Sequence, residues 1–143
     1  MREVGLVRSA YHFGRPADSA VDQARYFVHV VNAKGGVHNS STMPLVLDLE
    51  QADGKSPAEV WAWVQAFMGE LEKLTGKPGN IYVGYYFWTG QTGNPSKNLG
   101  ADLWVAAYTP APKVPAAWKD WTFWQYTDKA SVPGISGGVD GGM

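Results

Sequence analysis

The feature that most constrains the fold is a short apolar run at residues 44–50 (PLVLDLE), which is followed at once by a helix signature. A short apolar run between polar loops is typical of a parallel strand that is buried on both faces. Ser56-Pro57-Ala58-Glu59 then forms a capping box, with serine at the N-cap and proline at the first helical position. Apolar residues continue at helical spacing until Gly76 and Pro78. The sequence therefore predicts a strand joined to an amphipathic helix.

A similar strand and helix precede this pair, and three bare strands follow it. Residues 4–13 (VGLVRSAYHF) predict a strand, and residues 20–31 then repeat apolar side chains at helical spacing. The later strand candidates are residues 80–88 (NIYVGYYFW), 103–108 (LWVAAY) and 121–127 (WTFWQYT). This order predicts an α/β fold, and more narrowly an irregular (β/α) barrel that residues 1–143 form as a single domain.

Composition excludes several function classes. Twelve Lys and Arg against thirteen Asp and Glu give a formal net charge of −1, so we expect neither nucleic acid nor anionic lipid as a partner. The chain has no cysteine for thiol chemistry and no run of about 18 apolar residues to span a membrane. Residues 1–6 lack the apolar run of a secretion signal, so we expect none in this chain. Seven Trp, seven Tyr and five Phe suit a carbohydrate groove, with a tryptophan-rich core as the alternative.

Asp48 and Glu50 are the sharpest chemical feature, because they lie two residues apart at the end of the apolar strand. Side chains alternate along a strand, so both carboxyls should point to one face, with their Cβ atoms within about 7 Å. This proximity disfavours double ionisation and raises the proton affinity of one carboxyl. A protonated acid beside a charged one is the arrangement that glycoside hydrolysis requires. The alternative is a solvated strand end, since D-x-E alone is a common pattern.

Aromatic and polar residues end several other predicted strands, at the edge where barrel active sites collect. They are Tyr11, His12, Phe13, Tyr86, Trp88, Tyr108, Gln125 and Tyr126. We expect His12 to be a hydrogen-bonded residue of the pocket floor rather than a catalyst. Alternation should turn Gln125 inward and Trp124 outward. The histidines show no metal-ligand spacing, so we expect neither a metal nor a cofactor.

The motifs, taken in order, resemble those of the glycoside hydrolase family 25 lysozymes, or N-acetylmuramidases. The matching segments are S-A-Y-H-F at 9–13, P-L-V-L-D-L-E at 44–50, I-Y-V-G-Y-Y-F-W at 81–88, L-W-V-A-A-Y at 103–108, W-Q-Y-T at 124–127 and G-V-D at 138–140. The resemblance implies cleavage of the β-1,4 bond between N-acetylmuramic acid and N-acetylglucosamine in bacterial peptidoglycan. It also implies action on the cell wall, by a secreted enzyme or a phage endolysin.

The resemblance also assigns roles to residues. Glu50 matches the general acid, and Asp48 matches the adjacent carboxylate that stabilises the positively charged transition state or orients the acetamido group of the substrate. The residues expected to bind substrate are Tyr11, His12, Phe13, Tyr86, Trp88, Tyr108, Gln125 and Asp140.

Two segments depart from the family pattern. Family members begin with a strand that carries D-V-S-x-x-Q, so roughly a quarter of the domain is expected to be absent before Met1. Residues 4–13 could then present an open sheet edge, through which the protein could self-associate. At the other end the family pattern is V-D-x-N and then an aromatic residue, whereas this chain has Val139-Asp140-Gly141-Gly142-Met143. A non-catalytic wall-binding module, or an inactive fragment, is therefore the alternative function.

Overall fold

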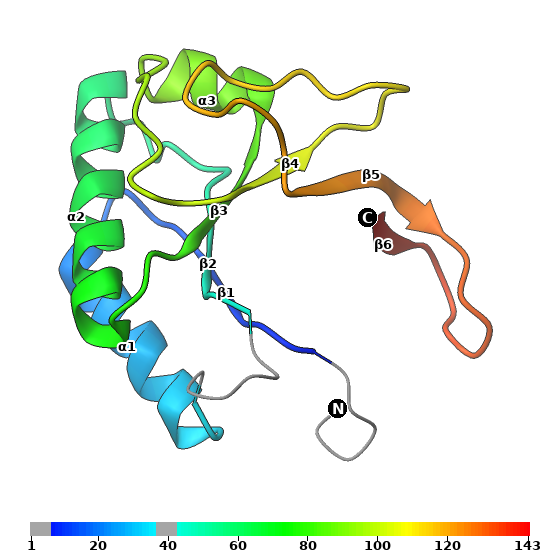
Figure 1. Cartoon of the computed structure of the whole chain (residues 1–143), viewed down its shortest axis with the longest axis horizontal. Coiled ribbons are helices and arrows are strands. Elements are labelled where there is room, and N and C mark those ends of the chain that lie inside the picture. The colour runs from blue at the N-terminus through cyan, green and yellow to red at the C-terminus, as the bar shows by residue number, and fades with distance from the viewer. Residues whose placement is uncertain (1–6, 37–42) are drawn as a thin grey trace.

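Strands and helices alternate along the first part of the chain, and strands dominate the last part (Figure 1). The computed structural model describes residues 7–36 and 43–143. The strands are β1 (Tyr11–Phe13), β2 (Val46–Asp48), β3 (Asn80–Gly84), β4 (Leu103–Ala106), β5 (Phe123–Ala130) and β6 (Val139–Gly142). The helices are α1 (Ala20–Ala33), α2 (Pro57–Thr75) and α3 (Tyr85–Gln91).

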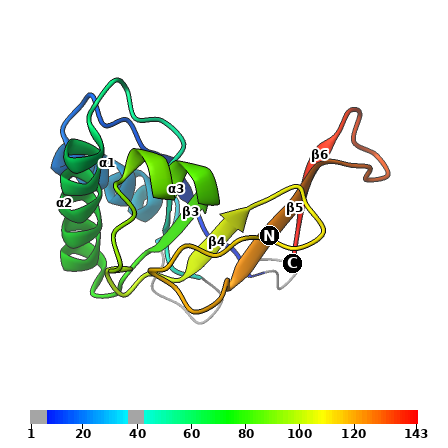
Figure 2. The same ribbon diagram turned by 90° about the horizontal axis from the view of Figure 1, so that it is seen from above.

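One curled sheet holds these strands, in the order in which they occur along the chain. Strands β1 to β5 pair in parallel, and β6 pairs antiparallel with β5. Helices α1 and α2 lie side by side beside the sheet in Figure 1, and Figure 2 shows the β5–β6 hairpin extending away from the region near these helices. Within the described residues the sheet stays open between β1 and β6. This architecture confirms the predicted α/β class.

The side of the sheet that faces the helices forms the hydrophobic core. Alternation along each strand turns every second side chain toward the helices, and apolar residues occupy those positions. The fully buried sheet residues are Leu47, Leu49, Ile81, Val83, Leu103 and Val105. Each such side chain stabilises the fold by about 1.5–3 kcal/mol relative to exposure. This burial determines which face packs on the helices, and it leaves the opposite face free to carry a site.

The predicted capping box starts α2. The Ser56 hydroxyl accepts the backbone N–H of Glu59, and the Glu59 carboxylate accepts the backbone N–H of Ser56 at 2.8 Å. Pro57 occupies the first helical position, and Gly76 ends the helix in a left-handed conformation with φ 73°. These contacts confirm the helix start and stop read from the sequence.

The strand predicted over residues 80–88 is wrong beyond Gly84, where the chain turns directly into α3. The ring of Trp88 is fully buried against Trp61 and Trp118, with centroid distances of 5.8 and 4.6 Å. The helical turn after Gly84 is what lets Trp88 reach these two rings. Tertiary packing therefore outweighs the β propensity of consecutive aromatic residues.

Other element boundaries differ from the prediction by a few residues. Strand β1 covers only the end of the strand expected at 4–13, of which residues 4–6 lie outside the described residues. Strand β4 ends at Ala106, so Tyr108 lies in the loop that follows it. In the part of the chain that the structure describes, no helix is long and apolar enough to cross a bilayer.

Candidate functional site

A cavity of about 340 Å³ opens on the face of the sheet opposite the core. Its lining combines carboxyls, aromatic rings and one amide, and it draws on strands β1 to β6. The lining residues are Tyr11, Val46, Asp48, Glu50, Tyr82, Trp104, Gln125, Asp140, Gly141 and Gly142. A concave site with a few convergent polar groups is the usual form of a small-molecule site.

The register of the parallel strands brings the central lining residues together. Asp48 pairs with Tyr82 on β3, and Tyr82 pairs with Trp104 on β4. Paired residues of neighbouring strands project to the same side, so these three side chains form one row across the floor of the cavity. The residues on either side of them in sequence point into the core instead.

Asp48 and Glu50 both line this cavity, as strand alternation predicts. Burial, and secondarily the charge of Glu50, raises the pKa of Asp48 to about 7. The Asp48 Oδ1 atom is buried and has no hydrogen-bond partner, so no donor offsets the cost of burying its charge. Asp48 therefore holds a proton near neutral pH. Burial thus opposes the charged, supporting role that the resemblance assigns to Asp48.

Tyr82 and Trp104 are site residues that the sequence reasoning missed. Burial, followed by the charge of Glu50, raises the pKa of Tyr82, so its phenol stays neutral. The Trp104 ring packs edge-on against Tyr82, with centroids 5.5 Å apart and planes at 85°. Each is the only aromatic residue between two aliphatic ones in its strand. This pattern, one aromatic side chain on the strand face opposite the aliphatic ones, is the sequence signal for both residues.

Gln125 and Tyr108 close one side of the cavity. The buried Gln125 side chain donates from Nε2 to the Tyr108 hydroxyl at 3.1 Å. Trp124 points the other way and donates from its indole nitrogen to the Ala107 carbonyl at 2.7 Å. The predicted inward Gln125 and outward Trp124 are therefore confirmed. Partial burial and the nearby carboxylates raise the pKa of the Tyr108 phenol.

Asp140 joins the cavity through the β5–β6 hairpin. Its neighbours Gly141 and Gly142 lie against β5, where side chains would not fit. A Cβ on Gly141 would lie 2.9 Å from Thr127 Cγ2, and one on Gly142 would lie 3.1 Å from the Trp124 carbonyl oxygen. Gly141, and Gly142 where the family pattern has asparagine, thus allow the close pairing with β5 that brings Asp140 to the site.

Two of the predicted substrate-binding residues do not face the cavity. His12 lies on the core side of β1, where Nε2 is 2.9 Å from Gln23 Oε1 and the ring stacks on Phe67. It is hydrogen-bonded as expected, but alternation turns it toward the helices and away from the cavity. Trp88 does not line the cavity either, since its ring is fully buried in the core.

Two others project from the sheet and helix without lining the cavity. Phe13 pairs with Asp48 and shares its face, at the β1 edge of the sheet. Tyr86 lies on α3, and its side chain is 73% exposed. The cavity therefore gathers Tyr11, Asp48, Glu50, Gln125 and Asp140, with Tyr108 bonded to its edge.

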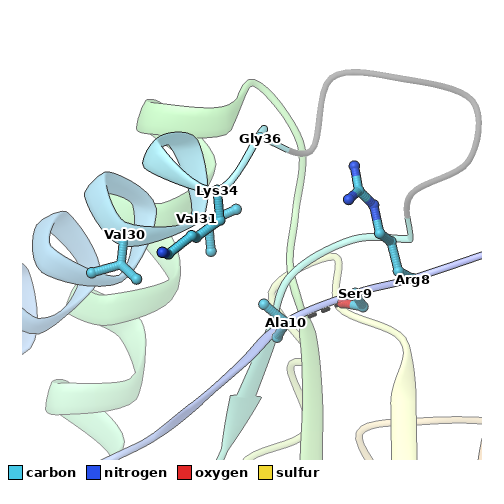
Figure 3. A pocket seen from close by; sticks show the side chains of 7 residues that line it. All are labelled: Arg8, Ser9, Ala10, Val30, Val31, Lys34 and Gly36. Carbon is cyan, nitrogen blue, oxygen red and sulfur yellow. Dashed lines mark hydrogen bonds between the residues drawn. The ribbon is translucent and has the colours of Figure 1, made fainter. Parts of the chain in front are cut away.

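A second cavity, of about 200 Å³, lies beside the C-terminus of α1 and the residues that lead into β1 (Figure 3). It is lined by Arg8, Ser9, Ala10, Val30, Val31, Lys34 and Gly36. This is the amino end of the strands, whereas sites in parallel α/β sheets lie at the carboxyl ends. Its lining includes no acid and no nucleophile paired with a base, so the first cavity is the candidate site.

The chain is similar to lysozymes and muramidases over nearly its whole length. A family model described as glycosyl hydrolases family 25 matches residues 1–135. Lysozyme M1 of Streptomyces globisporus is 35% identical, over 95% of this chain and 49% of that protein. The chain thus spans about half the length of that relative.

Solved structures show the same likeness. The crystal structure of the bacterial lysozyme from Streptomyces coelicolor is 32% identical, with a TM-score of 0.87 over 99% of this chain and 69% of that one. The muramidase from Acremonium alcalophilum is 33% identical, with a TM-score of 0.83 and the same coverage.

Proposed function

The chain belongs to family 25 of the glycosyl hydrolases, and from this premise we propose that it hydrolyses bacterial peptidoglycan. The bond cleaved would be the β-1,4 linkage between N-acetylmuramic acid and N-acetylglucosamine. The observation that carries the proposal is that Asp48 and Glu50 line one cavity. The raised pKa of Asp48, about 7, lets this pair of carboxyls hold a proton near neutral pH. Aromatic side chains beside them offer apolar faces to sugar rings.

The two carboxyls have different roles in the proposed glycoside hydrolysis. Glu50 is exposed at the cavity, where it can reach the leaving glycosidic oxygen, and Asp48 is set deeper beside Tyr82. Positive charge that develops on the sugar ring favours a charged Asp48, so its proton passes to Glu50 and then to the leaving oxygen. Asp48 is then the anion that stabilises the transition state or orients the acetamido group.

Replacing Glu50 with glutamine tests this assignment. We expect clearing of a bacterial wall suspension to slow by about 10²–10⁴-fold, because general acid catalysis is lost. Folding, followed by circular dichroism, and sedimentation with purified peptidoglycan should be unchanged. Unchanged lysis by the variant would rule out Glu50 as the acid. Binding by the wild-type protein without release of reducing ends would instead indicate a wall-binding module.

The pKa of Asp48 predicts how activity depends on pH. The proton that Glu50 delivers comes from Asp48, so kcat/KM should fall as the pH rises through about 7, where Asp48 ionises. Initial rates on soluble peptidoglycan between pH 5 and 9, taken in steps of about half a pH unit, measure this limb. A flat profile across neutrality would contradict a role for the Asp48 proton.

We further propose that the curled sheet is the greater part of an irregular (β/α) barrel and that its β1 edge allows self-association. The coverage of only 69% of the Streptomyces coelicolor lysozyme supports the first proposal, because that structure extends beyond the matched strands. The position of β1 at the end of the strand order supports the second. The protein would act at the cell wall, as a secreted enzyme or an endolysin.

A further inference from the structure

An exposed aromatic cluster lies on the same rim as the cavity but outside its lining. Tyr85 and Tyr86 begin α3 directly after the carboxyl end of β3, and their rings meet edge-on with centroids 5.3 Å apart. Lys113, from the loop that joins β4 to β5, lies over both rings, with Nζ 5.7 Å from the centroid of Tyr85 and 5.4 Å from that of Tyr86. We call these three residues the Tyr86–Lys113 platform.

The platform orders a lysine whose charge is otherwise unpaired. Lys113 Nζ donates to the Tyr86 hydroxyl at 3.3 Å. Its cation–π contacts are attractive but leave a full positive charge at the surface. Among residues 7–36 and 43–143, the salt bridges join Arg15 to Asp53 and Glu70 to both Arg25 and Lys73, and none involves Lys113. This cation is therefore held in place and free to meet an external anion.

Tyr86 supplies the second half of a binding surface. Its side chain is 73% exposed, although Trp88, two residues further along α3, is fully buried. An exposed aromatic face held by neighbouring side chains can stack on the apolar C–H face of a sugar. A carboxylate or phosphate on that sugar would find Lys113 within reach and form a charge-assisted hydrogen bond.

The charges of the cavity and the platform are opposite. Asp48, Glu50 and Asp140 line the cavity, and its lining includes no lysine or arginine to pair with an acidic substituent. The same substituent is attracted at Lys113. A glycan with acidic groups on alternate sugars therefore has a preferred placement, in which an acidic sugar lies at the platform.

We propose that the Tyr86–Lys113 platform is an additional subsite that binds a carboxylate-bearing sugar of the substrate glycan. This inference rests on the proposed function and adds a determinant of substrate class. The platform selects acidic glycan chains over uncharged ones of the same length, whereas the cavity carries out the cleavage.

Calorimetric binding to two oligosaccharides of equal length tests the platform. The ligands are the uncharged N-acetylglucosamine hexamer and an alternating N-acetylglucosamine–N-acetylmuramic acid hexasaccharide with free lactyl carboxylates. All proteins carry E50Q, so that neither ligand is cleaved. Lys113→Gln should weaken binding of the acidic ligand by about threefold at low salt and leave the uncharged ligand unaffected. The difference should vanish near 1 M salt, where the screening length is about 3 Å.

Three further variants separate the ring from the charge. Tyr86→Ala should weaken both ligands by up to about tenfold, because the stacking face is lost. Tyr86→Phe keeps the ring and removes the hydroxyl that holds Lys113, so it should weaken only the acidic ligand. Lys77→Gln makes the same charge change on an exposed residue before the amino end of β3, whereas the platform follows the carboxyl end of β3, and it should change neither affinity.

The outcomes separate the two proposals. Equal affinities of the Lys113→Gln and parent proteins for the acidic ligand would overturn the platform while leaving the hydrolase intact. A parent protein that binds neither oligosaccharide would overturn both.

Discussion

At the scale of single residues, the burial of the Asp48 side chain sets the pH at which this carboxyl of the cavity ionises. Its pKa is raised first by burial and only then by the charge of Glu50. The shift therefore depends on the row of side chains around Asp48, including Tyr82 on the neighbouring strand, as well as on the spacing of the two acids. A buried carboxyl without a hydrogen-bond donor lowers stability when it ionises.

Replacing Asp48 with asparagine should therefore change how stability depends on pH. In the unfolded chain Asp48 ionises near pH 3.8, whereas in the folded protein it does so near pH 7. Between these values the folded state binds the extra proton, so wild-type stability falls as the pH rises. Asp48→Asn removes this loss and should be more stable than wild type at pH 8, by about 1 kcal/mol after allowance for solvent screening.

Urea denaturation at pH 4 and pH 8 measures the difference between the two proteins. Comparing the variant with wild type cancels the opposite contributions of Asp53, Glu59 and Glu70, whose pKa values are lowered by their hydrogen bonds. A stability difference that does not change with pH would show that Asp48 is not buried as described.

At the scale of elements, the connection from α2 to β3 determines how tightly the helix packs on the sheet. Gly79 lies immediately before β3, where a Cβ would be 2.6 Å from Leu71 Cδ2 and 2.9 Å from the Leu45 carbonyl oxygen. The backbone neighbour cannot move aside cheaply, because it belongs to the segment that leads into β2. Gly69, within α2, has open space around its Cα.

These two glycines make a matched pair. Gly79→Ala should destabilise the protein by about 1–3 kcal/mol, because the added methyl overpacks the junction. Gly69→Ala should stabilise it by about 0.5–1 kcal/mol, because alanine is the better helix former. Thermal unfolding monitored by circular dichroism measures both, and a stabilising Gly79→Ala would contradict the described packing of the junction.

At the scale of the whole molecule, apolar side chains are exposed both on strand β1 and on helix α1. Tyr11 and Phe13 are exposed on the sheet, and Tyr26 and Val30 are exposed one turn apart on α1. Strand β1 also ends the strand order, so its outer backbone groups have no neighbouring strand within the described residues. An unpaired edge beside apolar side chains is a template for association.

Light scattering across a concentration series tests this property. We expect the mean mass of the wild-type protein to rise with concentration, and Tyr26→Lys to suppress the rise, because a charge would be brought into the contact. Tyr126→Lys serves as the control, because Tyr126 is an exposed aromatic residue on β5, far from β1 in the strand order. A wild-type mass that stays constant with concentration would refute self-association.

Much of the candidate site was predictable because its signals are local. The two-residue periodicity of a strand places Asp48 and Glu50 together and separates Gln125 from Trp124. Position at a strand end, together with the resemblance, placed His12 and Trp88 among the substrate-binding residues, and neither lines the cavity. For His12 the side of the sheet that faces the helices was not evident, and for Trp88 the chain is helical rather than extended.

The amino-acid sequence by itself determined the strand–helix order, the ends of α2 and the pairing of two acids on one face, because these depend on residues within a few positions of one another. Only the tertiary structure decided that Tyr82 and Trp104 join Asp48 in one row and that Lys113 lies over Tyr86. It also decided that burial raises the pKa of Asp48 to about 7. Strand register, burial and charge proximity are created by segments that lie far apart along the chain, so no local pattern records them.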